Sequence, residues 1–268
     1  MAKETAFAYK GSTALITGAS GGLGEAFAEE LAGRGSHLVL VGRSEEKLQA
    51  LARRLERQSN ITTTVLTADL ASANEVDQLI SDLKTRRIDV DLLINNAGFG
   101  VFQRFLETPL ARQIEEIDVN VRAVVSLTHA LAPGMVARRK GGVINISSSA
   151  GFQALAGANV YAASKSFVLL FSEALAQELV ATGVRVLAVC PGPIATGFFA
   201  DKKPDITRNE MDNPKTIVKE VLRAFDRGKR VLVPGKLSVR LMALTPRLFP
   251  RALMAQFGES VVRKLNHV

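Results

Sequence analysis

The stretch TALITGASGGLGEAFAEELAGR, residues 13–34, places a glycine-rich turn between an apolar run and an amphipathic pattern. The run from Thr13 to Thr17 is typical of a buried strand, and apolar residues recur at helical spacing from Gly24 to Arg34. Glycines let the backbone turn tightly and approach a ligand, while the free N–H groups of a helix N-terminus suit a pyrophosphate. The stretch therefore predicts a strand, a turn and a helix that bind a dinucleotide, with a turn that serves only packing as the alternative.

The same alternation continues along most of the chain. Further runs typical of buried strands lie at 37–41, 63–67, 91–95, 143–147, 184–190 and 230–233. Helical patterns lie between them, at 44–58, 72–87, 110–139, 159–181 and 214–227. Strands that alternate with helices imply a parallel sheet covered on both faces. The sequence predicts a single α/β domain of Rossmann type, with a doubly wound parallel sheet of about seven strands in residues 1–234. Residues 235–268 are predicted to form a basic amphipathic extension of that domain.

The composition favours one large globular domain. Of the 268 residues, 47% are hydrophobic and 22% are charged, which excludes a disordered chain. The only cysteine, Cys190, cannot form an intrachain disulfide and is expected in the core, and three histidines without ligand spacing predict no metal site. No apolar run follows the first charges of residues 1–10, and none reaches the roughly 18 residues of a membrane span. We therefore expect a cytoplasmic protein.

Four further motifs stand at corresponding places in the pattern. Asn-Asn-Ala-Gly at 95–98 ends the fourth predicted strand, Ser148 follows the fifth, and Pro-Gly at 191–192 follows the sixth. Tyr161 and Lys165 lie four residues apart, so they share one face of the helix that follows Ser148. The carboxyl ends of parallel strands form the ligand-binding edge of a doubly wound sheet. These motifs are therefore expected to meet at one edge.

In this order the motifs resemble those of the classical short-chain dehydrogenases/reductases, over about residues 12–233. The resemblance implies hydride transfer between a nicotinamide dinucleotide and a carbonyl or an alcohol. A free tyrosine, with a pKa of about 10, needs a neighbouring cation to act as acid or base near neutrality, and Lys165 is placed to supply it. Ser148 can donate a hydrogen bond to the substrate oxygen. The resemblance also assigns Lys165 to the nicotinamide ribose and Asn120 to a proton-relay water. The expected catalytic residues are Asn120, Ser148, Tyr161 and Lys165. Taken singly, Ser148 would be a turn hydroxyl, and Asn120 would indicate a capped or kinked helix.

Arg43 stands just after the predicted second strand, where an acidic residue would suit the ribose of NAD and a cation suits the 2′-phosphate of NADP. Arg43 therefore predicts a preference for NADP(H) over NAD(H), with a solvated charge at a helix start as the alternative. The resemblance implies that Asp69 and Leu70 contact the adenine ring, where a helix-initiating aspartate is the alternative, and that Thr196 binds the carboxamide. The expected cofactor-binding residues are Gly18, Ser20, Gly22, Leu23, Gly24, Arg43, Asp69, Leu70, Asn96, Ala97, Gly98, Tyr161, Lys165, Pro191, Gly192, Ile194 and Thr196.

The substrate is expected to have an apolar body, because phenylalanines follow several of the motifs. Phe99, Phe152 and Phe198 are the expected substrate-binding residues beside Ser148 and Tyr161, and Val101, Phe102 and Phe199 are further candidates for the wall. The expected activity is an NADP(H)-dependent oxidoreductase that acts on a small carbonyl or alcohol. Two other classes stay open. One is a dinucleotide-binding regulator without catalysis, which the intact residue set disfavours. The other is a nucleic-acid binder, which is suggested by the net charge of +8 and disfavoured by the lack of a recognition helix or aromatic platform.

The C-terminal tail carries most of the positive charge. From Gly228 onward eight basic residues stand against one acid, Glu259, so the tail holds +7 of the net +8. Apolar residues recur there at irregular helical spacing, interrupted by Pro246 and Pro250. The tail is expected to cover the substrate pocket or to pack against a second subunit, since the resembling family often forms homo-oligomers, either dimers or tetramers. The alternative is a surface anchor whose apolar faces enter an anionic bilayer.

Overall fold

The computed structural model describes residues 6–199 and 211–266, which contain a seven-stranded sheet. Neighbouring strands are parallel throughout, in the order β3-β2-β1-β4-β5-β6-β7. The strands are β1 Thr13–Thr17, β2 His37–Gly42, β3 Thr63–Thr67, β4 Leu92–Asn95, β5 Gly141–Ile146, β6 Val184–Val189 and β7 Val231–Leu232. The strand order reverses between β1 and β4, which confirms the predicted doubly wound sheet of Rossmann type.

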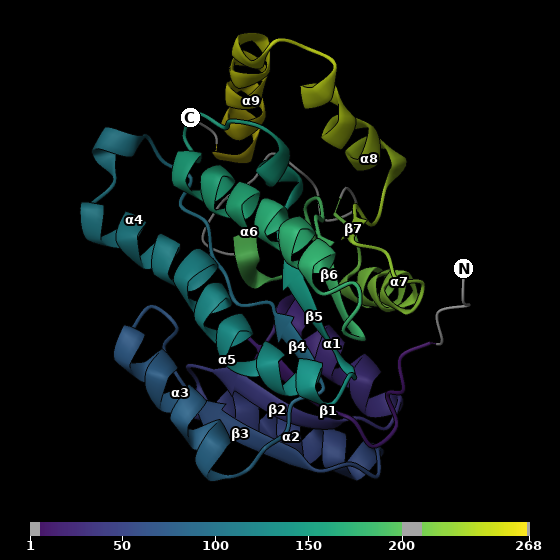
Figure 1. Cartoon of the computed structure of the whole chain (residues 1–268). Helices are drawn as coiled ribbons and strands as arrows, with labels where there is room; N and C mark the ends of the chain where they lie inside the picture. The colour runs from purple at the N-terminus through teal and green to yellow at the C-terminus, as the bar shows by residue number, and fades with distance from the viewer. Residues whose placement is uncertain (1–5, 200–210, 267–268) are drawn as a thin grey trace.

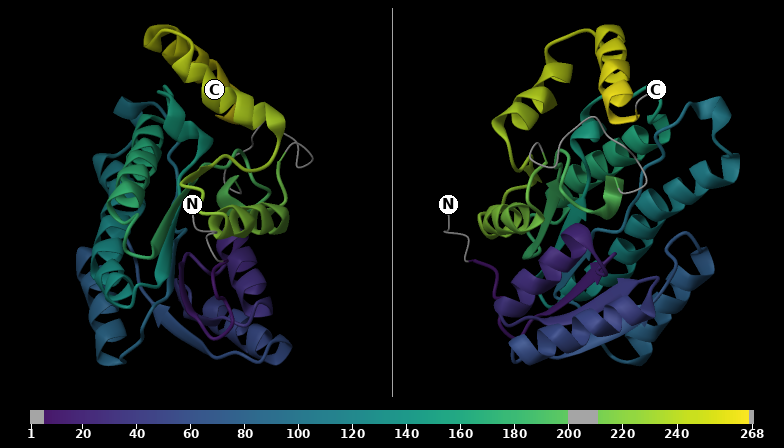
Figure 2. Two further views of the ribbon diagram at one scale, coloured as in Figure 1. Left: turned by 45° about the vertical axis from the view of Figure 1, so that its right-hand side comes forward. Right: turned by 180° about the vertical axis from the view of Figure 1, so that it is seen from behind.

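Helices cover both faces of the sheet (Figure 1). One layer consists of α1 Gly22–Gly33, α2 Glu45–Gln58 and α7 Pro214–Asp226. The other consists of α3 Ala73–Thr85, α4 Leu110–Ile117, α5 Ala123–Ala137 and α6 Asn159–Glu178. The left view of Figure 2 shows the two layers on either side of the sheet.

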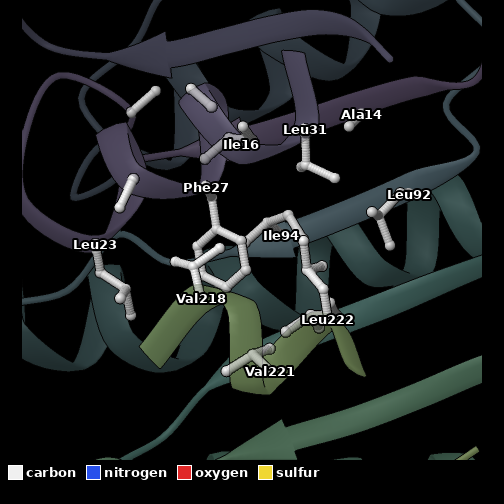
Figure 3. Close-up of a cluster of buried hydrophobic side chains, with 14 of the residues drawn as sticks. Ala14, Ile16, Leu23, Phe27, Leu31, Leu92, Ile94, Val218, Val221 and Leu222 are labelled. Carbon is white, nitrogen blue, oxygen red and sulfur yellow. The ribbon is translucent and has the colours of Figure 1, made fainter. Parts of the chain in front are cut away.

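Alternation along the strands explains why both faces are buried. Ala14 and Ile16 of β1 belong to the cluster under α1 and α7, whereas Leu15 between them belongs to the cluster on the opposite face. Figure 3 shows the first cluster, in which Phe27 of α1 meets Val218 of α7 above β1 and β4. Both faces of the parallel sheet are therefore packed against helices, as the continuous apolar runs predict.

Local capping fixes two of the helix starts. The hydroxyl of Ser44 accepts a hydrogen bond from the backbone nitrogen of Lys47, and that of Ser72 accepts one from Glu75, so these serines are the N-caps of α2 and α3. Cys190, directly after β6, is fully buried, as expected of a core residue.

The stretch 110–139, which predicts one helix, is divided into α4 and α5 by a π-helical turn, Asp118–Arg122. Such a turn inserts an extra residue into a helix, and it often lies at a functional site. Apolar periodicity does not reveal it, because the pattern continues on both sides. The turn places Asn120, which is 1% exposed, against α6.

The basic tail forms two helices at one end of the molecule, α8 Leu237–Leu244 and α9 Arg251–Asn266 (Figures 1 and 2). The segment that contains Pro246 and Pro250 separates them. Ala243, Met254 and Val262 are buried. The described large apolar side chains that stay exposed in the tail are Leu237, Leu241, Met242, Leu244, Leu248, Phe249, Leu253 and Phe257. No helix in the described ranges is long and apolar enough to cross a membrane. The boundary at residue 234 stays a prediction.

Candidate active site

The turn between β1 and α1 has room only for glycine at its critical positions. Gly18 and Gly22 have φ angles of +64° and +57°, which side chains rarely adopt. A Cβ atom at Gly24 would overlap the carbonyl oxygen of Gly18. The start of α1 therefore packs against the end of β1 at backbone distance, and the N–H groups at the start of α1 face the turn.

Asn96 connects this turn to the neighbouring strand. Its side-chain nitrogen donates to the carbonyl of Thr17 at 2.9 Å and to that of Gly18 at 3.2 Å. The hydroxyl of Thr17 accepts hydrogen bonds at 3.0 Å from the backbone nitrogens of Asn96 and Ala97. The Asn-Asn-Ala-Gly segment thus holds the ends of β1 and β4 together beside the turn.

The loop after β6 reaches the same turn. A Cβ atom at Gly22 would lie 3.1 Å from the Cβ of Thr196, so the Thr196 side chain borders the turn. Ile194 is buried and forms a parallel bridge with Asp212, which fixes the start of this loop. The carbonyl of Pro191 accepts a hydrogen bond from Ser149 at 2.9 Å. The loops that follow β1, β4, β5 and β6 therefore converge at one edge.

Tyr161 and Lys165 lie on α6 at the centre of this edge. Both are buried, at 8% and 4% exposure, and the lysine nitrogen is 5.9 Å from the centre of the tyrosine ring. Lys165 Nζ donates to the carbonyl of Ile146 at 3.0 Å. Ser148 caps the turn after β5, where its hydroxyl accepts from Ala150 at 3.1 Å, and it lies close enough to Tyr161 to lower the pKa of that group. The structure therefore brings Ser148, Tyr161 and Lys165 together.

Asn120 joins the same group through the π-helical turn. Its side-chain nitrogen donates to Ser164 at 3.1 Å and to the carbonyl of Phe99 at 2.9 Å, and its oxygen accepts from the nitrogen of Phe99 at 3.2 Å. A Cβ atom on Gly98 would lie 2.9 Å from this oxygen and 3.1 Å from Lys165 Nζ. Only a glycine fits between the two side chains.

Burial shifts the proton affinities of the pair in opposite directions. The pKa of Tyr161 is raised to about 12, mainly by burial. Ser148 acts to lower this pKa, and the charge of the Glu116 carboxylate acts to raise it. The pKa of Lys165 is lowered to about 8, mainly by burial. The charges of Glu116 and, to a smaller extent, Cys190 act to raise this pKa. A tyrosine and a lysine that are buried close together and have shifted pKa values are typical of an acid–base site.

Aromatic rings cover Tyr161. The ring centres of Phe102 and Phe198 lie 5.4 Å and 5.8 Å from that of Tyr161, and they are 6.3 Å from each other. Phe99 instead lies under the guanidinium of Arg112, 4.1 Å from its centre. Phe152 packs against the cluster of Leu169, Ala188 and Cys190. Of the three expected substrate-binding phenylalanines, only Phe198 is thus brought onto Tyr161. The side chain of Phe199 lies outside the described part of the chain.

At the far end of the turn, Arg43 is exposed, and it has no ion-pair partner among the described residues. Ser20 lies beside it, with its hydroxyl 3.5 Å from where a Cβ of Gly42 would stand. Asp69 accepts a hydrogen bond from Ala71 at 3.0 Å in a local turn before α3, and the side chains of Leu23 and Leu70 are in the core. Any ligand contact of those two leucines would come from the backbone.

The tail closes over the opposite end of the site. Val262 of α9 belongs to the apolar cluster that contains Tyr161 and Leu155. A Cβ atom at Gly258 would overlap the carbonyl oxygen of Ala154, and one at Gly192 would lie 2.8 Å from Val239 of α8. These contacts were not predicted residue by residue, because the sequence gives no register for a tail joined by two prolines. Glu116, which is fully buried near Lys165, was also missed.

No group of three or more histidine, cysteine or acidic side chains among the described residues is placed to hold a metal ion.

Comparisons with known proteins show the family of the chain. The profile of the family described as short chain dehydrogenase matches residues 12–207. Very-long-chain 3-oxoacyl-CoA reductase of Mus musculus is 32% identical over 245 residues, which cover 90% of this chain and 76% of that protein. A short-chain dehydrogenase from Sphingobium yanoikuyae, solved in complex with NADPH, is 34% identical, with a TM-score of 0.79 over 91% of this chain and 95% of that one. The bulky-bulky ketone specific alcohol dehydrogenase from Comamonas testosteroni is 32% identical, with a TM-score of 0.76 over 91% of this chain and 93% of that one. The chain is therefore an oxidoreductase of the short-chain dehydrogenase/reductase family.

Proposed function

We propose that the protein transfers a hydride between NADP(H) and a carbonyl or secondary alcohol with an apolar body, with Tyr161 as the acid and base. The observation that carries this proposal is the buried group of Ser148, Tyr161 and Lys165 beside a turn in which a Cβ at Gly24 would not fit. A relative with 34% identity binds NADPH, which supports the cofactor.

The residues at the sheet edge fit a dinucleotide. Glycines let the turn fold tightly at Gly18, Gly22 and Gly24, and a Cβ at Gly21 would meet nothing within 4 Å, so phosphates can approach the N-terminus of α1 there. Thr196 borders this turn at Gly22, and Lys165 lies beside Tyr161 further along the same edge. The expected cofactor-binding residues are therefore proposed to line a continuous path from Arg43 to Tyr161.

When bound, the nicotinamide supplies or accepts the hydride. In the reducing direction the hydroxyl of Tyr161 donates a proton to the substrate oxygen, and in the oxidising direction its phenolate removes that proton. Ser148 donates a hydrogen bond to the same oxygen, which stabilises the negative charge that develops there. The ammonium of Lys165 favours the phenolate, and Asn120 holds the Gly98 segment against Lys165.

The substrate proposal rests on the rings of Phe102 and Phe198, which cover Tyr161. Apolar walls favour a substrate with apolar groups on its carbonyl carbon. The test is a panel of ketones, aldehydes, 3-oxoacyl esters and secondary alcohols, followed by the absorbance of NADPH. We expect the highest kcat/KM for apolar ketones or 3-oxoacyl esters. Absence of turnover with every member would favour the regulator without catalysis.

A preference for NADPH over NADH is the prediction that tests the role of Arg43. The 2′-phosphate can make a charge-assisted contact with this exposed side chain, worth about 1.5–3 kcal/mol, so we expect kcat/KM to favour NADPH by roughly tenfold or more. Arg43→Asp should reverse the order, because it adds a ribose acceptor and repels phosphate. Arg53→Asp, the same charge change at an exposed site on α2, is the control and should leave the ratio unchanged. Equal kcat/KM for both cofactors in the native enzyme would refute the assignment.

The basic tail does not by itself support nucleic-acid binding. Its described outer face carries large apolar side chains rather than a continuous row of cations, and Arg240 is paired with Glu220. Filter binding to DNA over a salt series separates the readings, since binding through phosphates weakens steeply with salt. We expect no such binding.

We also propose that the chain forms a homo-oligomer in the cytoplasm. The cytoplasm is proposed because the single cysteine is buried and unpaired. The oligomer is proposed because the protein exposes an apolar surface besides that of the tail. The neighbouring helices α4 and α6 expose large apolar side chains to solvent: Leu110, Ile114, Ile117, Phe167 and Leu170. A contiguous patch of this kind on a globular protein marks an interaction surface, and a second copy of the chain is the proposed partner.

The tail is proposed to act as a cover for the substrate end of the site, because Val262 packs with Tyr161. Gly258→Ala should displace α9, since the new Cβ would overlap the Ala154 carbonyl oxygen. We expect kcat/KM to fall by about tenfold, in line with the roughly 1–3 kcal/mol of strain from overpacking. Gln256→Ala, an exposed position on the same helix, is the control.

Two measurements separate this reading from a bilayer anchor. Sedimentation equilibrium of the native protein and Gly258→Ala reports whether the tail changes the oligomeric state. Co-sedimentation with phosphatidylglycerol vesicles reports membrane binding. Native activity in Gly258→Ala together with tight binding of the native protein to these vesicles would establish an anchor and exclude a cover.

A further inference from the structure

Three buried polar side chains on one face of α4 and the π-helical turn hold the loop that follows β4. Gln113 donates to the carbonyls of Phe105 and Thr108 at 3.0 Å and 3.3 Å. One turn further on, Glu116 accepts from the backbone nitrogen of Val101 at 3.3 Å. Asn120, described above, makes the corresponding contacts to Phe99. The three positions lie close to one helix face, so together they tether the loop at successive points.

Glu116 differs from the other two in its charge. Gln113 and Asn120 show that an amide is sufficient to hold the loop, yet Glu116 is a carboxylic acid with no exposed surface. An ionised carboxylate is strongly unfavourable in the protein interior unless a cation compensates it. The loop tether alone therefore does not explain why an acid stands at this position.

The compensating cation lies on the other side of the tethered loop. A Cβ atom at Gly98 would lie 3.1 Å from Lys165 Nζ, and one at Gly100 would lie 2.8 Å from the Tyr161 ring. Val101, which Glu116 holds, follows directly after Gly100. One backbone segment thus separates the carboxylate from the tyrosine–lysine pair, and α4 packs against α6.

We propose that Glu116 is a positioning residue for hydride transfer, whose ionised carboxylate keeps the buried Lys165 protonated while its oxygen fixes the loop over Tyr161. The proposal rests on the proposed function, because it acts through that pair. It assigns to a buried acid on α4 a part in setting the pH range of the enzyme.

The charges around Lys165 agree with this role. Burial lowers the pKa of Lys165 to about 8, and the charge of Glu116 is the largest influence that opposes it, followed by Cys190 at the end of β6. Tyr161, Glu173 and Glu178 are the other titratable groups on its own helix, and of these Tyr161 lies beside Lys165. The remaining charged side chains of α4 and the π-helical turn are paired elsewhere, Arg112 with Glu115 and Asp118 with Arg122.

The expected direction follows from these signs. Loss of the carboxylate charge lowers the pKa of Lys165, so the ammonium is lost at a lower pH. The alkaline limb of kcat/KM should therefore move to lower pH by about one unit, the lower end of the range for a nearby charge. At pH values above the alkaline limbs of both enzymes, kcat/KM of the variant should be about tenfold below that of the native enzyme. At pH values below both limbs, the two values should agree within a few-fold.

The experiment compares three variants of the full-length protein. Glu116→Gln keeps an oxygen for the Val101 nitrogen and removes the charge, whereas Glu116→Asp keeps the charge. Glu115→Gln, the neighbouring acid in its pair with Arg112, is the matched control. We expect the alkaline limb to move only in Glu116→Gln. The dissociation constant of NADPH, measured by fluorescence over the same pH range, should rise at the same lower pH if Lys165 holds the ribose.

A limb that stays at its native position in Glu116→Gln overturns the proposal, even if kcat falls, because a tether alone would give that result. Infrared difference spectra of native protein against Glu116→Asp provide a measurement that does not depend on the glutamine variant. They should show an ionised carboxylate near neutral pH, and a protonated carboxyl band would refute the role. Native turnover in Tyr161→Phe would instead refute the proposed function, so the two failures are distinguishable.

Discussion

Replacement of Tyr161 by phenylalanine is expected to lower kcat by about a thousandfold or more, the upper part of the range for a missing acid–base group. NADPH binding should stay close to native, because the hydroxyl acts on the transition state and the ring, which packs against Phe102 and Phe198, is retained. Lys165→Ala should impair both turnover and NADPH binding, since Lys165 is proposed to serve both.

Stopped-flow turnover and fluorescence titration of NADPH measure the two effects separately. Tyr9→Phe is the matched control, because Tyr9 is the other tyrosine of the chain and its hydroxyl bonds to Asp226 at 2.8 Å, away from the sheet edge. A Tyr161→Phe enzyme with native kcat would show that the proton comes from another group.

The second large effect is expected for Gly24→Ala. The added Cβ would overlap the Gly18 carbonyl oxygen and lie 2.7 Å from the Asn96 side chain, whose nitrogen is held by hydrogen bonds to the carbonyls of Thr17 and Gly18. The turn would have to open, with a strain of about 1–3 kcal/mol, so NADPH affinity should fall by roughly tenfold to a hundredfold. The melting temperature should fall as well.

Gly33→Ala tests whether this effect belongs to the turn. It lies on the same helix, and a Cβ there would meet nothing within 4 Å. Alanine favours helix over glycine by about 1 kcal/mol, so the control should keep native NADPH affinity and equal or raised stability. Unchanged NADPH titration and melting in Gly24→Ala would contradict the close approach of α1 to β1.

The sheet could be predicted because the residues that indicate each strand are adjacent in the sequence. Apolar runs such as 13–17 and 184–190 are bounded by turn residues, and their alternation with helices leaves few ways to pack. The π-helical turn could not be predicted, because apolar residues recur at helical spacing before and after Asp118–Arg122 and their spacing does not mark the inserted residue. Motif order also predicted that Ser148, Tyr161 and Lys165 lie together at one edge, where the structure places them.

The side chains around that edge make contacts with residues that are distant in the sequence, so the sequence alone did not predict them. Phe198 reaches Tyr161 and Phe152 does not, although both are phenylalanines in loops after strands. The direction in which a phenylalanine in a loop points depends on the backbone conformation of that loop. The spacing of apolar residues does not predict this direction. Glu116 was missed for a similar reason, because a glutamate in a helix of mixed charge looks like a solvent-exposed residue until the packing of α4 against α6 is known.

The π-helical turn also restricts insertions and deletions in this part of the gene. Each residue advances an α-helix by about 100°, so removing one between Glu116 and Leu127 would rotate α5 by that angle relative to α4. Leu127, now fully buried, and the loop-binding face of α4 could not both keep their partners. One-residue insertions and deletions should therefore be eliminated by selection here, although substitutions on the outer face of either helix are tolerated, and the 118–122 segment should keep its length wherever the fold and the site are both retained.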